Sequence, residues 1–129
     1  MLRCLIVDDS RRFLDAARGL LESQGMAVVG VASTGAEAIE RAAELSPDVV
    51  LLDIDLGGES GLELAGRLHR DASLAPLLVI LISTHSEKDY ADLIASSPAV
   101  GFLPKMALSG NAIREMLEGR GVGEPVRPA

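Results

Sequence analysis

The sequence predicts an α/β fold in which helices cover both faces of a parallel sheet. Five short aliphatic segments alternate along the chain with longer segments whose apolar residues recur with helical period. Several of the short segments are apolar at every position, which is typical of strands buried on both faces. The chain has 129 residues, the common size of a single domain. These observations favour one domain built from alternating strand–helix units.

The aliphatic segments define the strands. The five predicted strands are Leu2–Val7, Ala27–Ala32, Val49–Leu52, Leu77–Ile82 and Val100–Leu103. Because a helix follows each strand, the connections are expected to be right-handed crossovers between parallel strands. Five such units in a chain of this length predict a flavodoxin-like, doubly wound (βα)5 sheet with strand order 2-1-3-4-5.

The first predicted helix carries an apolar stripe at spacings of four, three and one. The stripe consists of Phe13, Ala17, Leu20 and Leu21, and Gly25 is expected to end the helix.

The second predicted helix opens on a capping box, in which Thr34 and Glu37 each accept a hydrogen bond from a free backbone N–H. Its expected buried face is Ile39, Ala42 and Ala43, and Pro47 marks its end.

Three shorter helical segments complete the pattern. The third helix is predicted from a stripe of Leu62, Ala65, Leu68 and His69. The fourth is predicted around Tyr90–Ala95, and the fifth begins after a Ser109 cap. The stripe of the fifth helix is Ile113, Met116 and Leu117.

Composition excludes several functions. Twelve basic and nineteen acidic side chains give a net charge of −7, and only 2% of residues are aromatic, so nucleic acid is not expected as a direct ligand. The single cysteine, Cys4, is typical of a reducing compartment. The amino terminus lacks the plan of a signal peptide, and the longest aliphatic run, Leu77–Ile82, is too short to span a bilayer. We therefore expect a cytoplasmic protein with no membrane partner.

Polar residues gather where the predicted strands end. Asp8 and Asp9 follow the first strand, Asp53 the third, Ser83-Thr84 the fourth and Lys105 the fifth. In the predicted order the first and third strands are neighbours, so three carboxylates should converge on the crevice beyond the carboxyl ends of the strands. Strict alternation would send neighbouring residues to opposite faces. Both carboxylates of the acidic pair can reach the crevice only if the strand ends there.

Three converging acids suit phosphoryl transfer supported by a cation. Their mutual repulsion predicts a raised pKa for at least one of them unless a cation is bound, and Mg²⁺ takes such oxygen ligands. The cation would neutralise the charge that keeps a carboxylate and a phosphoryl group apart. Asp53 closes the central strand and is the predicted nucleophile, forming an acyl phosphate. Lys105 and Ser83 would contact phosphoryl oxygens.

The sequence resembles the receiver domain of two-component response regulators over residues 1–118. The matching segments are LIVDDS (5–10), DVVLLDIDLGGESGLEL (48–64), VILIST (79–84) and GFLPK (101–105). The intervals of thirty residues from Asp53 to Ser83 and twenty-two from Ser83 to Lys105 also match. The remaining residues, 119–129, contain several glycines and prolines and are predicted to form a flexible C-terminal tail.

The resemblance implies a role for each acid. Asp53 would be the phosphoacceptor, supplied by a histidine kinase, a phosphotransfer protein or a small-molecule phosphodonor. Asp9 would bind Mg²⁺ directly and Asp8 through water, and Asp55 would contribute its backbone carbonyl.

The resemblance also implies roles at the other strand ends. Ser83, rather than the neighbouring Thr84, would be the hydroxyl residue that moves to the phosphoryl group, and Lys105 would pair with that group. Phe102 occupies the position of an aromatic switch, although a plain core role is an equally open interpretation. Asp55 and His85 lie where the family tunes its dephosphorylation rate.

Four positions depart from the family pattern and bear on rates and output geometry. Thr84 replaces a small residue, which is expected to narrow access to the phosphoryl site. Gly57 replaces a common proline and is expected to loosen its turn. Met106 replaces the proline that often follows the lysine, and Phe102 lacks the hydroxyl of the more frequent tyrosine.

Three functions follow from these patterns. The first is a stand-alone, chemotaxis-regulator-like switch whose output surface is the face of the fourth helix, fifth strand and fifth helix. It would catalyse its own phosphorylation and dephosphorylation without being an enzyme in the turnover sense, contact a downstream protein, and form a phosphorylation-dependent homodimer. The second is an isolated receiver from a DNA-binding regulator. The third, from the Asp53-Ile54-Asp55 pattern, is a haloacid-dehalogenase-like phosphatase.

Overall fold

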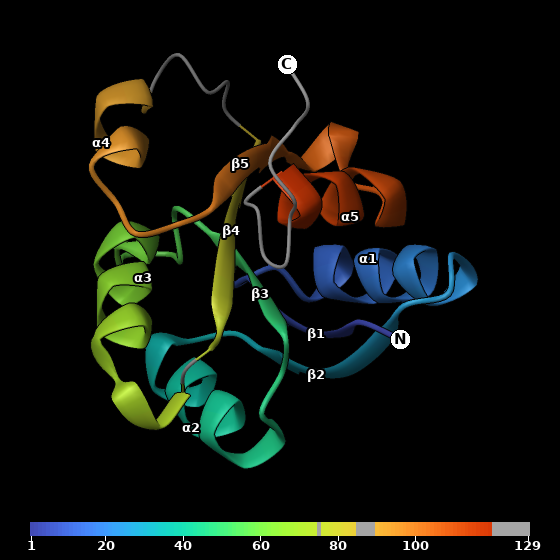
Figure 1. The fold of residues 1–129 in the computed structure, drawn as a ribbon, viewed down its shortest axis with the longest axis horizontal. Helices are drawn as coiled ribbons and strands as arrows, with labels where there is room; N and C mark the ends of the chain where they lie inside the picture. The colour runs from blue at the N-terminus through green and yellow to red at the C-terminus, as the bar shows by residue number, and fades with distance from the viewer. Residues whose placement is uncertain (75, 85–89, 120–129) are drawn as a thin grey trace, which may run out of the picture.

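The computed structural model describes residues 1–74, 76–84 and 90–119, and its centre is a parallel sheet (Figure 1). The strand order is β2-β1-β3-β4-β5, as predicted. The strands are β1 (Arg3–Val7), β2 (Ala27–Ala32), β3 (Val49–Asp53), β4 (Leu78–Ser83) and β5 (Gly101–Pro104). The observed bounds differ from the predicted ones by no more than one residue at either end.

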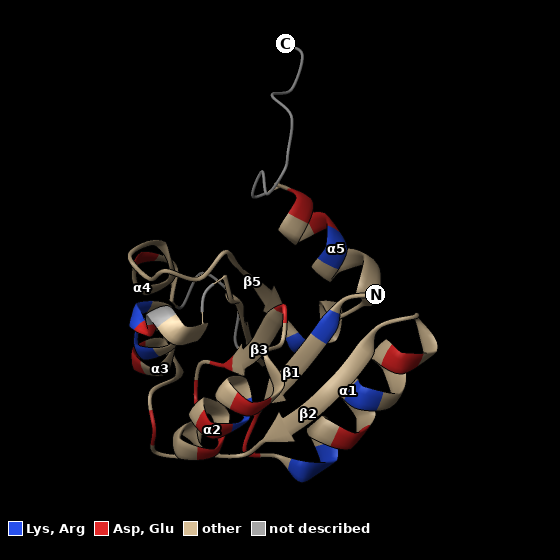
Figure 2. Cartoon of the chain, turned by 60° about the horizontal axis from the view of Figure 1, so that its bottom comes forward, with Lys and Arg blue, Asp and Glu red and all other residues tan. Residues whose placement is uncertain are grey.

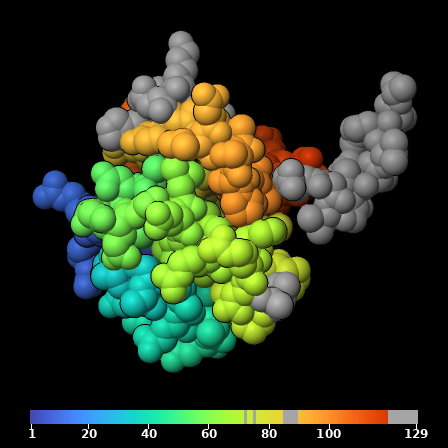
Figure 3. Space-filling view, turned by 90° about the vertical axis from the view of Figure 1, so that its left-hand side faces the viewer, coloured from blue at the N-terminus to red at the C-terminus, as the bar shows by residue number. Residues whose placement is uncertain are grey.

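Helices cover both faces of the sheet, and their order also follows the prediction. They are α1 (Arg11–Ser23), α2 (Gly35–Leu45), α3 (Gly61–Arg70), α4 (Ala91–Ala95) and α5 (Gly110–Gly119), with short 3-10 turns η1 (Ala72–Leu74) and η3 (Lys105–Ala107). In Figure 1, α1 and α5 lie on one side of the sheet and α2, α3 and α4 on the other. Figure 3 looks onto the second of these faces, where α2, α3 and α4 form the surface.

Alternation along the buried strands divides the core between the two faces. Leu5 and Val7 of β1 pack toward α2, α3 and α4, whereas Cys4 and Ile6 pack toward α1 and α5. The same division recurs in β3 and β4. Every residue of β3 is buried. This explains why the strands are apolar without a break in sequence: both alternating sets of side chains face helices.

Three helices bury faces that differ in part from the predicted stripes. Leu20 is 39% exposed while Leu14 is buried in its place. Ala43 and His69 are also exposed, and Ala38 and Leu64 are buried instead. Each wrongly assigned residue is the immediate neighbour of a buried one: Leu21, Ala42 or Leu68. One residue turns the chain by about 100° around the helix axis, so such a neighbour leaves the sheet-facing side.

Hydroxyl side chains begin the longer helices. Ser10 Oγ accepts a hydrogen bond from the N–H of Phe13 at 3.2 Å, and Ser109 caps α5 in the same way. Thr34 Oγ1 accepts from the N–H of Glu37 at 3.1 Å, as predicted. Glu37 also accepts from a backbone N–H, that of Ser33 at 2.9 Å, one residue before the cap. These bonds satisfy N–H groups that the helices cannot pair internally.

No helix in the described part of the chain combines the length and the apolar character that crossing a bilayer requires. Figure 2 shows basic and acidic residues alternating along α1, a pattern of solvated helix faces.

Candidate functional site

The acidic pair lies where β1 gives way to a loop. β1 ends at Val7, and the N–H of Asp8 still donates to the carbonyl of Ala32 at 3.0 Å. The chain then turns into α1, with Asp8 Oδ1 accepting from the N–H of Ser10 at 2.9 Å. Because the strand stops here, Asp8 and Asp9 are released from strict alternation and both reach the same edge of the sheet.

Asp53 is the last residue of β3, between β1 and β4. It is 6% exposed and pairs with Ile82 of β4 in the sheet register. Asp53 Oδ1 accepts a hydrogen bond from the N–H of Asp55 at 3.0 Å. This bond ties the carboxylate to the start of the following loop.

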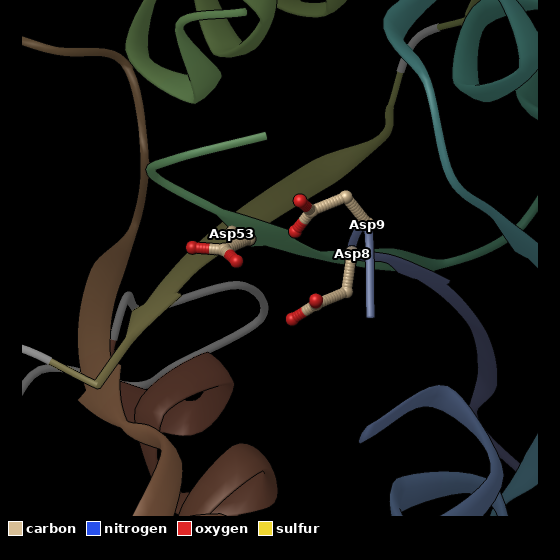
Figure 4. A group of neighbouring side chains, drawn as sticks. All are labelled: Asp8, Asp9 and Asp53. Carbon is tan, nitrogen blue, oxygen red and sulfur yellow. The ribbon is translucent and has the colours of Figure 1, made fainter. Parts of the chain in front are cut away.

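The three carboxylates come together as the topology predicts. One oxygen from each of Asp8, Asp9 and Asp53 lies within 4.8 Å of the other two. Figure 4 shows all three side chains pointing into one space beyond the strand ends. Asp8 is completely buried, whereas Asp9 is exposed to solvent. The cluster therefore reaches solvent at Asp9.

Lys105 provides the cation of the cluster. It follows β5 in the η3 turn, and its Nζ lies 2.6 Å from Asp8 Oδ2 and 3.2 Å from Asp53 Oδ2. The contact with Asp53 is also a hydrogen bond. Three carboxylates at −3 and one ammonium at +1 leave −2 when all four groups are charged. The pairing compensates the cluster only in part.

Burial and charge together shift the titration of the cluster. Burial is the largest influence on Asp53 and, with the charge of Asp8, raises its pKa from 3.8 to about 6, against the opposing effects of the Asp55 N–H and Lys105. Burial would lower the pKa of Lys105, but the contacts with Asp8 and Asp53 outweigh it and raise that pKa. The predicted raised carboxylate pKa is present, although burial contributes more than repulsion.

The cluster has the properties of a site for a hard divalent cation. Its side chains offer carboxylate oxygens, the ligands that Mg²⁺ prefers, and carry an excess charge of −2. Asp8 Oδ2 is fully buried. Lys105 Nζ lies 2.6 Å from this oxygen and pairs with its charge. A cation at this point would satisfy the remaining lone pairs of a buried carboxylate.

The other predicted site residues lie at the same end of the sheet or beside it. Ser83 closes β4, one position beyond the residue that pairs with Asp53, and is 2% exposed, whereas Thr84 is exposed. Phe102 is buried on β5, within the core beneath α2, α3 and α4. Asp55 is exposed, and its carboxylate accepts from the N–H of Gly57 at 3.2 Å instead of joining the cluster.

The prediction for His85 concerns a residue outside the described part of the chain, and so does the predicted tail from residue 120 onward. Gly119, the first residue of that predicted tail, is the last residue of α5.

The turn after β3 requires glycine, for backbone conformation at two positions and for space at one of them. Gly57 and Gly58 have φ of 62° and 106°, in the left-handed region that favours glycine. Proline fixes φ near −65° and cannot replace Gly57 in this turn. A Cβ on Gly57 would also lie 2.6 Å from Asp9 Oδ2. Gly57 therefore gives Asp9 its space, and the two adjacent glycines were the signal for this turn in the sequence.

Phe13 is a neighbour of the cluster that the sequence pattern assigned only to an apolar stripe. Lys105 Nζ lies 4.4 Å from the centroid of its ring, within the range of a cation–π contact. The signal in the sequence was its place four residues after Asp9, at the start of the first helix.

One protein family matches this chain over nearly all of the residues that form the sheet and its helices. The profile of the response regulator receiver domain matches residues 4–118. The chain belongs to this family. This match confirms the resemblance and the predicted fold class. It identifies a receiver domain and not the haloacid-dehalogenase-like phosphatase of the third hypothesis.

Individual relatives agree with this assignment. A protein-glutamate methylesterase/protein-glutamine glutaminase 5 of Myxococcus xanthus is 39% identical over 105 residues, which cover 81% of this chain and 30% of that protein. The solved signal receiver domain of NarL from Mycobacterium tuberculosis is 31% identical with a TM-score of 0.79, and the match covers 92% of this chain and 98% of that one.

A third relative was solved with a metal. The response regulator protein TrrA from Thermotoga maritima, in complex with Mg(2+)-BeF, is 27% identical with a TM-score of 0.76, and the match covers 92% of this chain and 98% of that one. The curated relatives are longer than the receiver domain, since the chain spans between 30% and 64% of the first three.

Proposed function

We propose that this receiver domain accepts a phosphoryl group on Asp53 and uses it to switch contacts with other proteins in a phosphorelay. One observation carries the proposal. The Asp53 carboxylate closes the central strand, lies in a cluster with Asp8 and Asp9, and is held at Oδ2 by Lys105. A nucleophile beside two further acids and a fixed cation suits transfer of an anionic group.

The reaction is the displacement of a leaving group at phosphorus. A carboxylate oxygen of Asp53 forms a new P–O bond while the P–N bond of a phosphohistidine, or the P–O bond to the acetyl group of acetyl phosphate, breaks. The electron pair of that bond leaves with imidazole or acetate. Attack of water on the aspartyl phosphate then returns the carboxylate and releases inorganic phosphate, which resets the domain.

Magnesium is the cofactor that the cluster fits. Asp9 would hold it directly, Asp8 through water, and Asp53 and the backbone carbonyl of Asp55 would complete the protein ligands. When bound, the ion supplies the positive charge that offsets repulsion between the carboxylates and the phosphoryl group. The fit rests on the three converging carboxylates and the excess charge of −2 that Lys105 leaves, and the TrrA complex with Mg(2+)-BeF supports it.

The remaining site residues would contact the phosphoryl group, transmit the conformational change and set the lifetime of the phosphorylated state. Lys105 would pair with a phosphoryl oxygen, and Ser83 would donate its hydroxyl hydrogen to another. The new contacts at the ends of β4 and β5 would repack Phe102 and change the face formed by α4, β5 and α5. Asp55 and His85 would set the rate of hydrolysis. The charge change is local, and its output is a shift between two pre-existing conformations.

The partners follow from this chemistry. A histidine kinase or phosphotransfer protein would supply the phosphoryl group in the cytoplasm, and a downstream protein or a second copy of the domain would bind the switched face. The net charge of −7 makes direct nucleic-acid binding by this domain an unsuitable output. Two settings fit the proposal: a stand-alone regulator, or the receiver portion of a longer one. Because the curated relatives are longer than this chain, the receiver portion of a longer regulator is the setting that they favour.

Incubation with acetyl phosphate and Mg²⁺, followed by intact-mass measurement, tests the proposal. A single phosphoryl adduct is expected on the native protein and no adduct on Asp53→Asn. Asp15→Asn, which changes an exposed acid of α1, is the matched control and should retain the adduct. Native protein that stays unmodified under these conditions would refute the phosphoacceptor function.

Replacement of Asp9 by alanine tests the metal assignment separately. Loss of a direct carboxylate ligand is expected to weaken Mg²⁺ binding about tenfold or more, equivalent to about 1.4 kcal/mol, and to slow phosphorylation at limiting Mg²⁺. Calorimetric titration with Mg²⁺ measures the affinity, with Asp15→Ala as the charge-matched control. An Asp9→Ala protein with native Mg²⁺ affinity would contradict the assigned role.

A further inference from the structure

We propose that Phe13 is a positioning residue for Lys105: its ring holds the ammonium over the acidic cluster while the charges around that ammonium change. The inference deepens the proposed phosphoryl-acceptor function and rests on it. It concerns a residue of α1 that belongs neither to the carboxylate cluster nor to the strand ends.

Lys105 contacts two carboxylates and one aromatic ring. Its Nζ contacts Asp8 Oδ2 at 2.6 Å and Asp53 Oδ2 at 3.2 Å, and the Phe13 ring centroid lies 4.4 Å away. The lysine side chain is 14% exposed. The ring therefore provides an apolar partner for an ammonium that is already largely removed from solvent, a setting in which cation–π attraction is strongest.

Hydrogen bonds from backbone N–H groups fix the position of Phe13 relative to Asp8. Ser10 Oγ accepts from the N–H of Phe13 at 3.2 Å, and the N–H of Ser10 donates to Asp8 Oδ1 at 2.9 Å. The Phe13 side chain is half-buried and packs against the core beneath α1 and α5. One short segment thus carries both Asp8 and the ring that faces Lys105, so their relative positions are set by the first turn of α1.

The ring differs from the other two partners because its interaction does not change during the reaction. Phosphorylation would turn the Asp53 carboxylate into an acyl phosphate, and Asp8 would share its charge with the bound cation. Both carboxylate contacts of Lys105 would weaken at the moment when the ammonium must reach a phosphoryl oxygen. A lysine stem has four flexible carbons, and the ring restricts the positions that its ammonium can take.

The rate of Asp53 phosphorylation by acetyl phosphate at saturating Mg²⁺ tests this role. Phe13→Leu keeps an apolar side chain but removes the π face, and is expected to slow phosphorylation about 3- to 10-fold. Phe13→Tyr keeps the face and should restore the rate. Leu20→Ala, on the exposed side of the same helix, is the control for general perturbation of α1 and should retain the native rate.

A double-mutant cycle with Lys105→Met separates positioning from a structural role. If Phe13 acts through the ammonium, Phe13→Leu has no further effect on the rate in the Lys105→Met background. An equal loss of rate in both backgrounds would show that the ring supports the fold only, and would overturn the inference.

A measurement without phosphodonor separates failure of this inference from failure of the proposed function. NMR of the native protein should show ring-current shifts on the Lys105 ε-methylene protons, and Phe13→Leu should abolish them. Absence of these shifts in the native protein overturns the inference. Native protein that forms no adduct refutes the phosphoacceptor function and this role with it, whereas equal adduct rates in native and Phe13→Leu protein overturn the positioning role alone.

Discussion

Replacement of Gly61 by alanine is expected to destabilise the domain by about 3 kcal/mol or more. Gly61 is the first residue of α3, and its N–H donates to the carbonyl of Ile54 at 2.7 Å. A Cβ at this position would overlap the carbonyl oxygen of Asp53 and lie 2.8 Å from the Cα of Ile54. These are backbone atoms next to the central strand, so relief of the overlap requires α3 or the end of β3 to move.

Chemical denaturation followed by circular dichroism measures this loss. Gly66→Ala is the matched control on the same helix, because its Cβ would approach only the end of the flexible Arg70 side chain, at 3.0 Å. Alanine is favoured over glycine in a helix by up to about 1 kcal/mol, so this control should equal or exceed the native stability. A Gly61→Ala protein as stable as the Gly66→Ala protein would show that the close approach is not a constraint.

Replacement of Asp53 by asparagine is expected to stabilise the metal-free domain by about 3 kcal/mol at about pH 7.5. Burial, with the added charge of Asp8, makes the ionised Asp53 unfavourable in the folded protein. Asparagine keeps the size of the side chain and removes the charge. The same substitution that abolishes the proposed phosphoacceptor therefore strengthens the fold.

The sign of the pH dependence follows from the raised pKa. The pKa of Asp53 is about 6 in the folded protein and 3.8 as its ordinary value, so the folded state binds more protons than the unfolded state between these values. The preferential protonation of Asp53 in the folded state stabilises the protein. This stabilisation is fully present below pH 3.8 and is lost as the pH rises through 6. The stability gap between Asp53→Asn and native protein should accordingly close as the pH falls toward about 4.

Urea denaturation of both proteins over this range in the presence of a chelator measures the gap. At neutral pH, added Mg²⁺ should also reduce the difference in stability between the two proteins, because a bound cation stabilises the ionised cluster of the native protein. A gap of constant size from acid to neutral pH would show that the charge of Asp53 is not its source.

The sheet was predictable to within one residue at each strand end because its strands are short and continuously apolar. Such segments need helices on both faces, and that requirement fixes an alternating order of strands and helices. The helix faces were less predictable. Leu20, Ala43 and His69 belong to acceptable stripes in sequence, but the position of the sheet decides which side of each helix is covered.

The gathering of Asp8, Asp9 and Asp53 was predictable for a related reason. In a parallel sheet the carboxyl ends of neighbouring strands meet at one edge, so residues far apart in sequence can be assigned to one place from topology alone. The size of the pKa shift on Asp53 was not predictable, because burial is its largest cause and burial depends on the packed structure.

The sequence by itself therefore determined the fold class, the strand order and the family, together with the edge of the sheet where the acids meet, since these depend on patterns along the chain. The tertiary structure alone decided the contact of Phe13 with Lys105, the close approach of Gly61 to Asp53 and the space that Gly57 leaves for Asp9. Each of these is a contact between separate segments at a distance of a few ångströms. Such contacts depend on how the segments pack, and no spacing along the sequence encodes that packing directly.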